Sequence, residues 1–143
     1  MKILIMGLPG SGKTTLAEKL SIDLVNDCQQ NVSWFNADEI RKQFDDWDFS
    51  HEGRMRQAQR MKDFADSYPD DIAICDFVAP IKEMRDLFDA DYIIWMNTIT
   101  QSIYEDTNKL FEIPEKFDIV VTEKDCEKWS TIILKDIKEK FNV

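Results

Sequence analysis

The 143-residue chain is poor in the residues that build disulfide and zinc sites. It has three cysteines, an odd number, and a single histidine, His51. Cys28, Cys75 and Cys126 are widely spaced, and no second type of zinc ligand accompanies them. Reduced thiols are therefore expected, and neither a zinc site nor a disulfide framework is predicted.

The chain also lacks long hydrophobic runs. No apolar segment approaches the ~20 residues that are needed to cross a bilayer. The N-terminal apolar stretch continues into a glycine-rich loop, not into a small-residue cleavage site. These features predict a cytoplasmic protein with no membrane association.

Positive charge is scarce. Lysine and arginine total 18 against 28 acidic residues, which gives a net charge of −10. Such a field repels a polyanion, so a long nucleic acid is not favoured as partner, although a local pocket of cations and backbone N–H groups can hold a small anion. We expect a small-molecule partner and one domain over residues 1–143, and the sequence leaves open whether two copies form a homodimer.

Short apolar segments alternate with amphipathic ones, which is typical of β-α units. Strands are predicted at residues 2–6, 32–35, 71–76, 92–96 and 117–121. Helices are predicted at residues 14–26, 53–67, 81–88 and 124–140, together with a short helix that Asp38 would cap. Residues 98–115 are expected to be the least structured. The fold class is therefore α/β, a three-layer P-loop kinase fold with a five-stranded, mostly parallel sheet flanked by helices.

Residues 7–14, GLPGSGKT, match the phosphate-binding pattern G-x-x-x-x-G-K-[ST] after an apolar strand. In such a loop backbone N–H groups point at phosphate oxygens, the lysine reaches the β- and γ-phosphates, and the hydroxyl completes a Mg²⁺ shell. The predicted cofactors are ATP and Mg²⁺. The predicted nucleotide-binding residues are Gly7, Leu8, Pro9, Gly10, Ser11, Gly12, Lys13, Thr14 and Thr15.

Asp76 ends an apolar strand, a position from which P-loop proteins hold Mg²⁺ through water. It is a candidate metal residue with Thr14, and a simple strand-terminal turn residue is the alternative. Residues 36–41, NADEIR, follow the second strand, which the usual kinase sheet order would place beside the first. There Asp38 would accept a proton from an acceptor hydroxyl, and Arg41 would hold an anionic group.

Further motifs follow in order: Asp48-Phe49-Ser50 with Arg54, Gln57 and Arg60 after it, FVAP at residues 77–80 with Arg85 after it, and PEKFDI at residues 114–119. With the first two motifs, this series resembles the adenylylsulphate kinase (APS kinase) family, whose members carry GLSGSGKST, DGDNVR, GFSxxDRxxNIRR, FISP and PE-x-PD. The resemblance implies a reaction of sulfate assimilation, the ATP-dependent phosphorylation of the 3′-hydroxyl of adenosine 5′-phosphosulfate (APS) to give PAPS.

The resemblance also implies roles for individual residues. Asp38 would be the base, with Lys13 at the transferred phosphate. Arg41 and Arg54 would clamp the phosphosulfate, and Phe49 would stack on the acceptor adenine. The full set of predicted acceptor-binding residues is Asp38, Arg41, Phe49, Arg54, Gln57, Phe77, Val78 and Ala79. The alternatives are a solvated helix face for Arg54, Arg56 and Arg60, and core packing for Trp47 and Phe49.

The chain departs from the family motifs at several positions. Asn36, Ala37, Gly53 and Gln57 replace Asp, Gly, Asp and Asn. The basic and aromatic lid RD-x-KGLY-K is largely missing from residues 98–111, where Lys109 is the sole basic residue. Two other functions stay open: a polynucleotide 5′-hydroxyl or other small-molecule kinase, and an ATP-binding regulatory module without transfer, which the missing lid favours.

Overall fold

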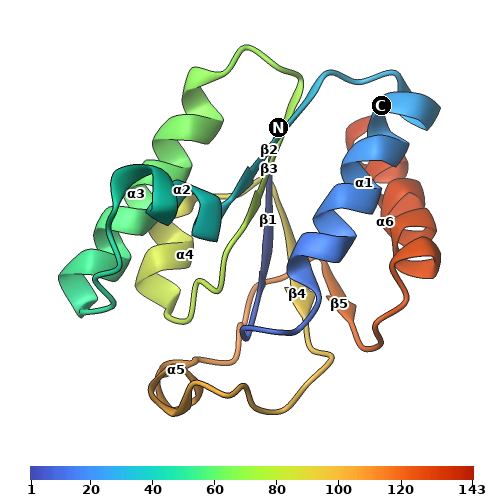
Figure 1. Cartoon of the computed structure of the whole chain (residues 1–143). Helices are drawn as coiled ribbons and strands as arrows, with labels where there is room; N and C mark the ends of the chain where they lie inside the picture. The colour runs from blue at the N-terminus through green and yellow to red at the C-terminus, as the bar shows by residue number, and fades with distance from the viewer.

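A computed structural model describes all of residues 1–143. Its centre is one parallel sheet with the strand order β2-β3-β1-β4-β5 (Figure 1). The strands are β1 Lys2–Gly7, β2 Val32–Asn36, β3 Ile72–Asp76, β4 Tyr92–Met96 and β5 Ile119–Val121. Apolar residues fill these short strands because both faces of the sheet are covered.

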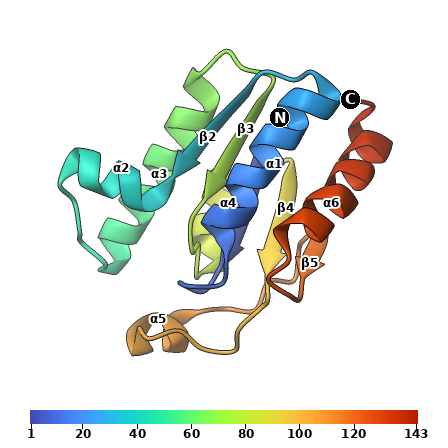
Figure 2. The ribbon, with the colours of Figure 1, turned by 45° about the vertical axis from the view of Figure 1, so that its right-hand side comes forward.

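Helices form a layer on each face of the sheet, and Figures 1 and 2 show both layers. One layer contains α1 Lys13–Cys28 and α6 Cys126–Phe141, and the other contains α2 Ala37–Phe44, α3 His51–Ser67 and α4 Lys82–Phe88. A short sixth helix, α5 Glu105–Leu110, lies apart from both layers, beyond the carboxyl ends of the strands. The predicted three-layer α/β architecture is confirmed.

Side chains of β1 alternate between two hydrophobic clusters. Ile3 and Ile5 pack with α1 and α6, whereas Leu4 and Met6 pack with α2, α3 and α4. This alternation follows from the two-residue period of a strand. It fixes β1 in the middle of the molecule, so the loop that follows β1 is held firmly.

One prediction about the sheet is wrong: β2 does not lie beside β1. Residues 32–36 pair in parallel with residues 72–76, and β3 separates the two strands. The end of β2 is therefore about 10 Å from β1, two strand spacings of ~4.8 Å. As a result Asp76, at the end of β3, lies between the phosphate loop and the residues that follow β2.

The prediction of Asp38 as a helix cap is also wrong. Asn36 caps α2, and its side-chain oxygen accepts a hydrogen bond from the Glu39 N–H. Asn and Asp cap helices equally well, so the sequence did not separate the two. Asp38 is instead in the first turn of α2 and exposed.

Element boundaries agree with the predicted ones to within two residues, including the last strand, which begins at Ile119. The expected unstructured segment at residues 98–115 contains α5. None of the helices has both the length and the apolar character of a membrane span.

Candidate active site

The phosphate loop joins β1 to α1. Gly7, Gly10 and Gly12 have φ values of 152°, 82° and 98°, a region that side chains rarely adopt. Gly7 also has no room for a side chain, since a Cβ atom there would lie 2.6 Å from the Met96 carbonyl oxygen. β4 therefore approaches the loop closely, and the loop keeps the shape that leads its backbone into the first turn of α1.

Lys13 lies at the start of α1 and is buried, with 8% of its surface exposed. Its Nζ donates a hydrogen bond to the Leu8 carbonyl across the loop at 3.0 Å. Burial lowers its pKa to about 8, and the carboxylates of Asp76 and Asp38 oppose this shift. A buried ammonium group with so few partners is well placed to pair with an anion that enters the cleft.

Asp76 is almost completely buried at the end of β3. Its Oδ2 accepts a hydrogen bond from Trp34 Nε1 at 2.7 Å, and Oδ1 accepts one from Asn36 Nδ2 at 3.0 Å. The Thr14 hydroxyl donates to Oδ1 at 3.4 Å. Burial raises the pKa of Asp76, whereas the hydrogen bonds from Trp34 and Asn36 lower it.

The oxygens of Thr14 and Asp76 suit Mg²⁺, which prefers hard oxygen ligands. The chain holds no cluster of three or more His, Cys, Asp or Glu residues that would form a metal cage of its own. Mg²⁺ in kinases is typically held by few protein groups together with substrate phosphates and water. The donor set therefore fits a metal that arrives with a nucleotide.

The contacts of Asn36 explain why the chain has asparagine where the family motif has aspartate. Asn36 is the register partner of Asp76, and its amide nitrogen also donates to Thr14 Oγ1 at 3.1 Å. An aspartate at position 36 would place a second carboxylate against Asp76, which is costly for buried like charges. An uncharged amide at position 36 therefore allows a buried carboxylate at position 76 on β3.

One cleft of about 1300 Å³ opens beyond the carboxyl ends of the strands. It brings together two-thirds of the predicted site residues: Pro9, Gly10, Gly12, Lys13, Thr14, Thr15, Asp38, Phe49, Arg54, Asp76, Phe77 and Val78. Gly7, Leu8, Ser11, Arg41, Gln57 and Ala79 are adjacent in the chain or fold but do not line it. Residues predicted to bind the donor and residues predicted to bind the acceptor thus line one cleft.

Phe49 projects into the cleft with 52% of its surface exposed. The guanidinium carbon of Arg41 lies 4.3 Å from its ring centre, and that of Arg54 lies 5.6 Å from it. Trp47 lines the same cleft and is also half exposed. Neither aromatic residue belongs to the hydrophobic core, so the core-packing alternative is wrong for both.

The two arginines differ in how they are held. Arg41 Nη1 donates to the carbonyls of Asp46 and Asp48, whereas Arg54 donates only through Nε, to the Phe49 carbonyl at 2.8 Å. Burial lowers the pKa of both. Arg54 is buried and faces the cleft, which contradicts a solvated helix face; its unused Nη groups are available to an anion.

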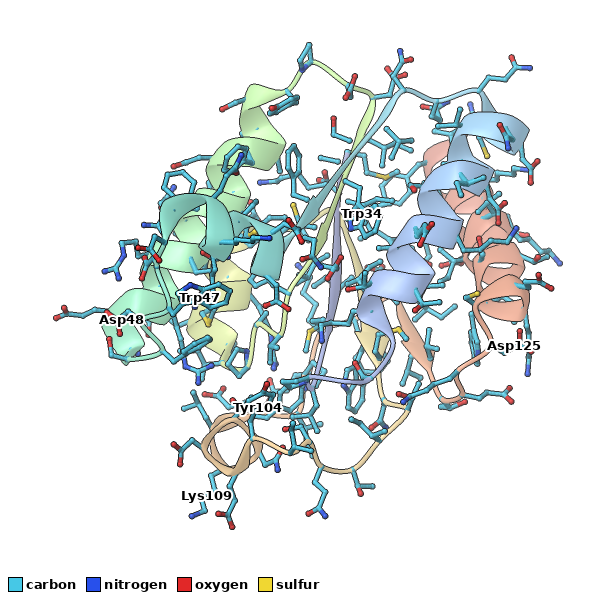
Figure 3. All side chains as sticks on the ribbon, viewed as in Figure 1. Trp34, Trp47, Asp48, Tyr104, Lys109 and Asp125 are labelled. Carbon is cyan, nitrogen blue, oxygen red and sulfur yellow. The ribbon has the colours of Figure 1, made fainter.

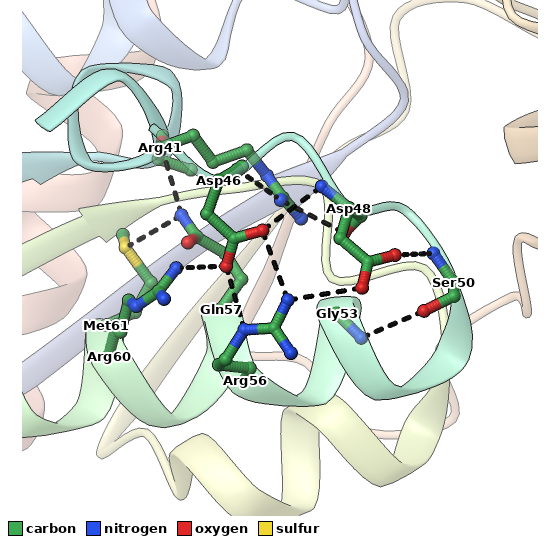
Figure 4. Close-up of polar contacts among 10 residues, drawn as sticks. Arg41, Asp46, Asp48, Ser50, Gly53, Arg56, Gln57, Arg60 and Met61 are labelled. Atoms are coloured by element: carbon green, nitrogen blue, oxygen red, sulfur yellow. Dashed lines mark hydrogen bonds and ion pairs between the residues drawn. The ribbon is translucent and has the colours of Figure 1, made fainter. Parts of the chain in front are cut away.

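The loop between α2 and α3 is braced by a network of charges (Figure 4). Asp46 accepts hydrogen bonds from Arg56 and Arg60, and Asp48 accepts one from Arg56. Of these arginines only Arg56 is strongly exposed, so the solvated-face alternative fits Arg56 and not Arg60. The network holds the segment that carries Trp47 and Phe49.

Gly53 allows this loop to pack tightly against α3. A Cβ atom at position 53 would lie 2.2 Å from the Asp48 carbonyl oxygen. The aspartate of the family motif cannot be accommodated here. Gln57, the other replacement on this helix, donates from Nε2 to the Ala37 carbonyl at 3.0 Å and so ties α3 to α2.

Residues 103–107 form the outer wall of the cleft; two of them are acidic and none is basic. They are Ile103, Tyr104, Glu105, Asp106 and Thr107. Figure 3 shows Tyr104 turned towards the body of the protein and Lys109 turned away from it. The one basic residue of the lid segment therefore contributes no charge to the cleft in this arrangement.

Two residues at the site, Trp34 and Lys124, are not predicted by any sequence motif. Trp34 reaches Asp76 from two residues before the end of its strand, and Lys124 lines the cleft from the loop before α6. Arg85 binds the carbonyls of Ala79, Pro80 and Glu112 behind the cleft. Nothing in the local sequence marks Trp34 or Lys124, whereas Arg85 follows the FVAP motif after four intervening residues, and the motif series includes it.

Among known protein families, the family model described as adenylylsulphate kinase matches residues 1–122 of this chain. No curated protein sequence matches at a significant level.

Solved structures show the same fold at low sequence identity. The APS kinase CysC of Mycobacterium tuberculosis, solved with AMPPNP and APS, has a TM-score of 0.79 and 16% identity over 96% of each chain. The hexameric APS kinase of Thiobacillus denitrificans has a TM-score of 0.77 and 22% identity, over 97% of this chain and 29% of that one. Shikimate kinase of Aquifex aeolicus has a TM-score of 0.69 and 17% identity over 97% of each chain. The three-layer fold is thus that of P-loop kinases.

Proposed function

This chain belongs to the adenylylsulphate kinase family and is a P-loop kinase, and from that membership we propose that it phosphorylates the 3′-hydroxyl of APS with ATP, giving PAPS and ADP. The observation that carries the proposal is the single cleft in which the phosphate loop, Asp38, Phe49 and Arg54 meet. Its volume of about 1300 Å³ exceeds the ~300–1,000 Å³ usual for one small ligand. There is room for a donor and an acceptor nucleotide side by side.

In the proposed reaction, Asp38 accepts the proton of the 3′-hydroxyl while that oxygen attacks the γ-phosphorus. A new P–O bond forms, and the bond from the γ-phosphorus to the bridging oxygen of the β-phosphate breaks. Lys13 and the loop N–H groups stabilise the charge that develops on the phosphoryl oxygens. Mg²⁺, held by Thr14 and Asp76, would neutralise the β- and γ-phosphates when bound.

The acceptor side offers an aromatic face beside a cation. Phe49 presents its ring to the cleft for stacking on adenine, and Arg54 supplies a guanidinium group for the phosphosulfate. Phe77 and Val78 complete the lining. Arg41, Gln57 and Ala79 would act from behind these residues. The proposal includes one kinase domain over residues 1–143 and a cytoplasmic setting, as the sequence predicts.

The acidic outer wall favours a second candidate. Glu105 and Asp106 line the cleft where the family has a basic lid, and they would repel a doubly anionic phosphosulfate. A small-molecule hydroxyl acceptor with less negative charge would avoid this repulsion. The same fold occurs in shikimate kinase, among the structural neighbours.

The test is to incubate the protein with labelled ATP and Mg²⁺ and to offer APS, shikimate and a 5′-hydroxyl oligonucleotide in parallel, with Lys13→Ala as the inactive control. Labelled PAPS above the control supports the leading proposal. Transfer to another acceptor alone would replace it with the second candidate. ATP binding without any transfer would assign the chain to the regulatory class.

A further inference from the structure

Trp34 contacts the predicted metal residue from a position that no motif marks. It lies on β2, two residues before Asn36, so both side chains project from the same face of the sheet. Asp76 projects from that face as well, because it is the register partner of Asn36. The indole Nε1 of Trp34 donates to Asp76 Oδ2 at 2.7 Å.

The two oxygens of the Asp76 carboxylate have different partners because of the hydrogen bond from the indole. Oδ2 is 2.7 Å from Trp34 Nε1 and 3.3 Å from the Asn36 amide. Oδ1 has the shorter bond to Asn36 and is the oxygen near the Thr14 hydroxyl. With Oδ2 engaged on the strand side, the carboxylate plane is set and Oδ1 faces the phosphate loop.

Packing holds the indole itself in place. Trp34 is half-buried against the hydrophobic cluster formed by α1, α6 and the sheet. A donor with a fixed position is worth more to a buried carboxylate than a mobile one, since no side-chain freedom is lost when the bond forms. The remainder of the ring makes apolar contacts, so phenylalanine would keep most of the packing and remove the donor.

We propose that Trp34 is a positioning residue for the metal of the bound nucleotide: its indole N–H fixes the Asp76 carboxylate, so that Oδ1 and Thr14 Oγ1 would be held ready for the metal. The inference rests on the nucleotide and Mg²⁺ part of the proposed function and on nothing about the acceptor. Residues that orient metal-bound groups in this way typically change metal affinity by ~10–100-fold when they are removed.

The first test uses the protein unchanged. The chain has four tryptophans, which give four indole N–H signals in a ¹⁵N spectrum, and the signal of Trp34 is the one lost in Trp34→Phe. Addition of Mn²⁺ with ADP should broaden the Trp34 signal at a Mn²⁺ concentration that leaves the Trp129 signal, from α6, sharp. Equal broadening of both signals, or of neither, would overturn the proposal.

The second test compares Trp34→Phe with Trp95→Phe. The Trp95 indole donates no hydrogen bond within the protein, so this variant is the matched control. Trp34→Phe should weaken Mn²⁺ binding in the ADP complex ~10-fold or more, measured by electron paramagnetic resonance. ADP affinity without metal should be unchanged, because Trp34 does not line the cleft. Trp95→Phe should bind Mn²⁺ like the parent.

An unchanged Mn²⁺ affinity in Trp34→Phe, or an equal loss of metal-free ADP binding, would contradict the positioning role of Trp34 and would leave the proposed function standing. A parent protein that binds neither ADP nor Mn²⁺–ADP would overturn the proposed function together with it. Transfer to an acceptor other than APS would leave the role of Trp34 untouched. Should Trp34→Phe fail to fold, the Trp34 signal is assigned by elimination from Trp47→Phe, Trp95→Phe and Trp129→Phe, and the spectrum of the unchanged protein still decides.

Discussion

The side-chain nitrogen of Asn36 lies 3.0 Å from Oδ1 and 3.3 Å from Oδ2 of Asp76, its register partner across β2 and β3. The same nitrogen lies 3.1 Å from Thr14 Oγ1, and the amide oxygen caps α2. One amide thus links the cap of α2, the acid of β3 and the hydroxyl of the phosphate loop. The contacts with Asp76 and Thr14 need a donor at position 36, and the cap needs an acceptor.

Asn36→Asp should therefore lower turnover strongly, although the two side chains are nearly equal in size. The cap survives, but a donor is replaced by a second carboxylate, and buried like charges raise the pKa of one of the pair. We expect turnover at neutral pH to fall ~10-fold or more, since one pKa unit corresponds to ~1.4 kcal/mol. Asn36→Ser, which keeps a neutral cap, is the control in kinase assays, and equal turnover of the two variants would contradict this explanation.

Asp38 provides the test of the proposed base. It is exposed in the cleft and its side chain makes no hydrogen bond to other protein groups, so Asp38→Asn should leave the fold intact. Turnover should fall by ~10² or more, with ATP affinity nearly unchanged. Turnover and the ATP dissociation constant should be measured beside Glu39→Gln, its exposed neighbour. A parallel loss of ATP affinity would move Asp38 to metal binding.

Phe49 should matter for the acceptor and not for ATP. Stacking of a base on an aromatic ring contributes ~1–3 kcal/mol, so Phe49→Ala should raise the acceptor KM ~10-fold or more at constant ATP KM. Phe44→Ala is a matched control, because Phe44 is equally exposed, lies 4.4 Å from the guanidinium carbon of Arg60 and does not line the cleft. Similar acceptor KM values for the two variants would argue against a stacking role.

Asp46 should stabilise the fold only above acidic pH. Its hydrogen bonds with Arg56 and Arg60 hold its pKa well below the usual range. A carboxyl group with a lowered folded pKa stabilises the protein above the unfolded pKa, and this contribution is lost as the pH falls towards the folded value. In urea unfolding, Asp46→Asn should have a lower midpoint than the parent at neutral pH, and the gap should narrow as the pH falls below about 4. A constant gap would mean that charge pairing is not the cause.

The sequence predicted those parts of the structure that depend on local pattern. Periodicity located five strands and five of the six helices, and glycine spacing located the phosphate loop before α1. What it missed depends on three-dimensional neighbours. The insertion of β3 beside β1 is set by which apolar faces pack together, and the contact of Trp34 with Asp76 exists only because residues 32–36 and 72–76 pair. The cap at Asn36 was missed because an aspartate two residues later offers the same chemistry.

Arg85 connects the FVAP segment, residues 77–80, to Glu112, which follows residues 98–111. Its Nε donates to the Ala79 carbonyl at 2.7 Å, and Nη2 donates to the carbonyls of Pro80 and Glu112 at 3.2 and 2.6 Å. Ala79 has a φ of 45°, a left-handed conformation that costs ~1–2 kcal/mol for a residue with a Cβ atom. The arginine therefore holds a strained turn directly behind Phe77 and Val78, which line the cleft.

Arg85→Ala should lower the free energy of unfolding by about 2 kcal/mol, since the buried Ala79 carbonyl is left without a partner, which costs ~1–3 kcal/mol, whereas the Pro80 carbonyl keeps the Glu112 N–H. The acceptor KM should rise in parallel, because the turn no longer fixes the cleft wall. Arg85→Lys keeps the charge but not the planar fork, so it should recover less than half of the loss. Urea unfolding and acceptor KM are the measurements, with the exposed Lys82→Ala on the same helix as control. If Arg85→Lys matched the parent in both, the charge alone would hold the turn, and the geometry of the guanidinium group would not be needed.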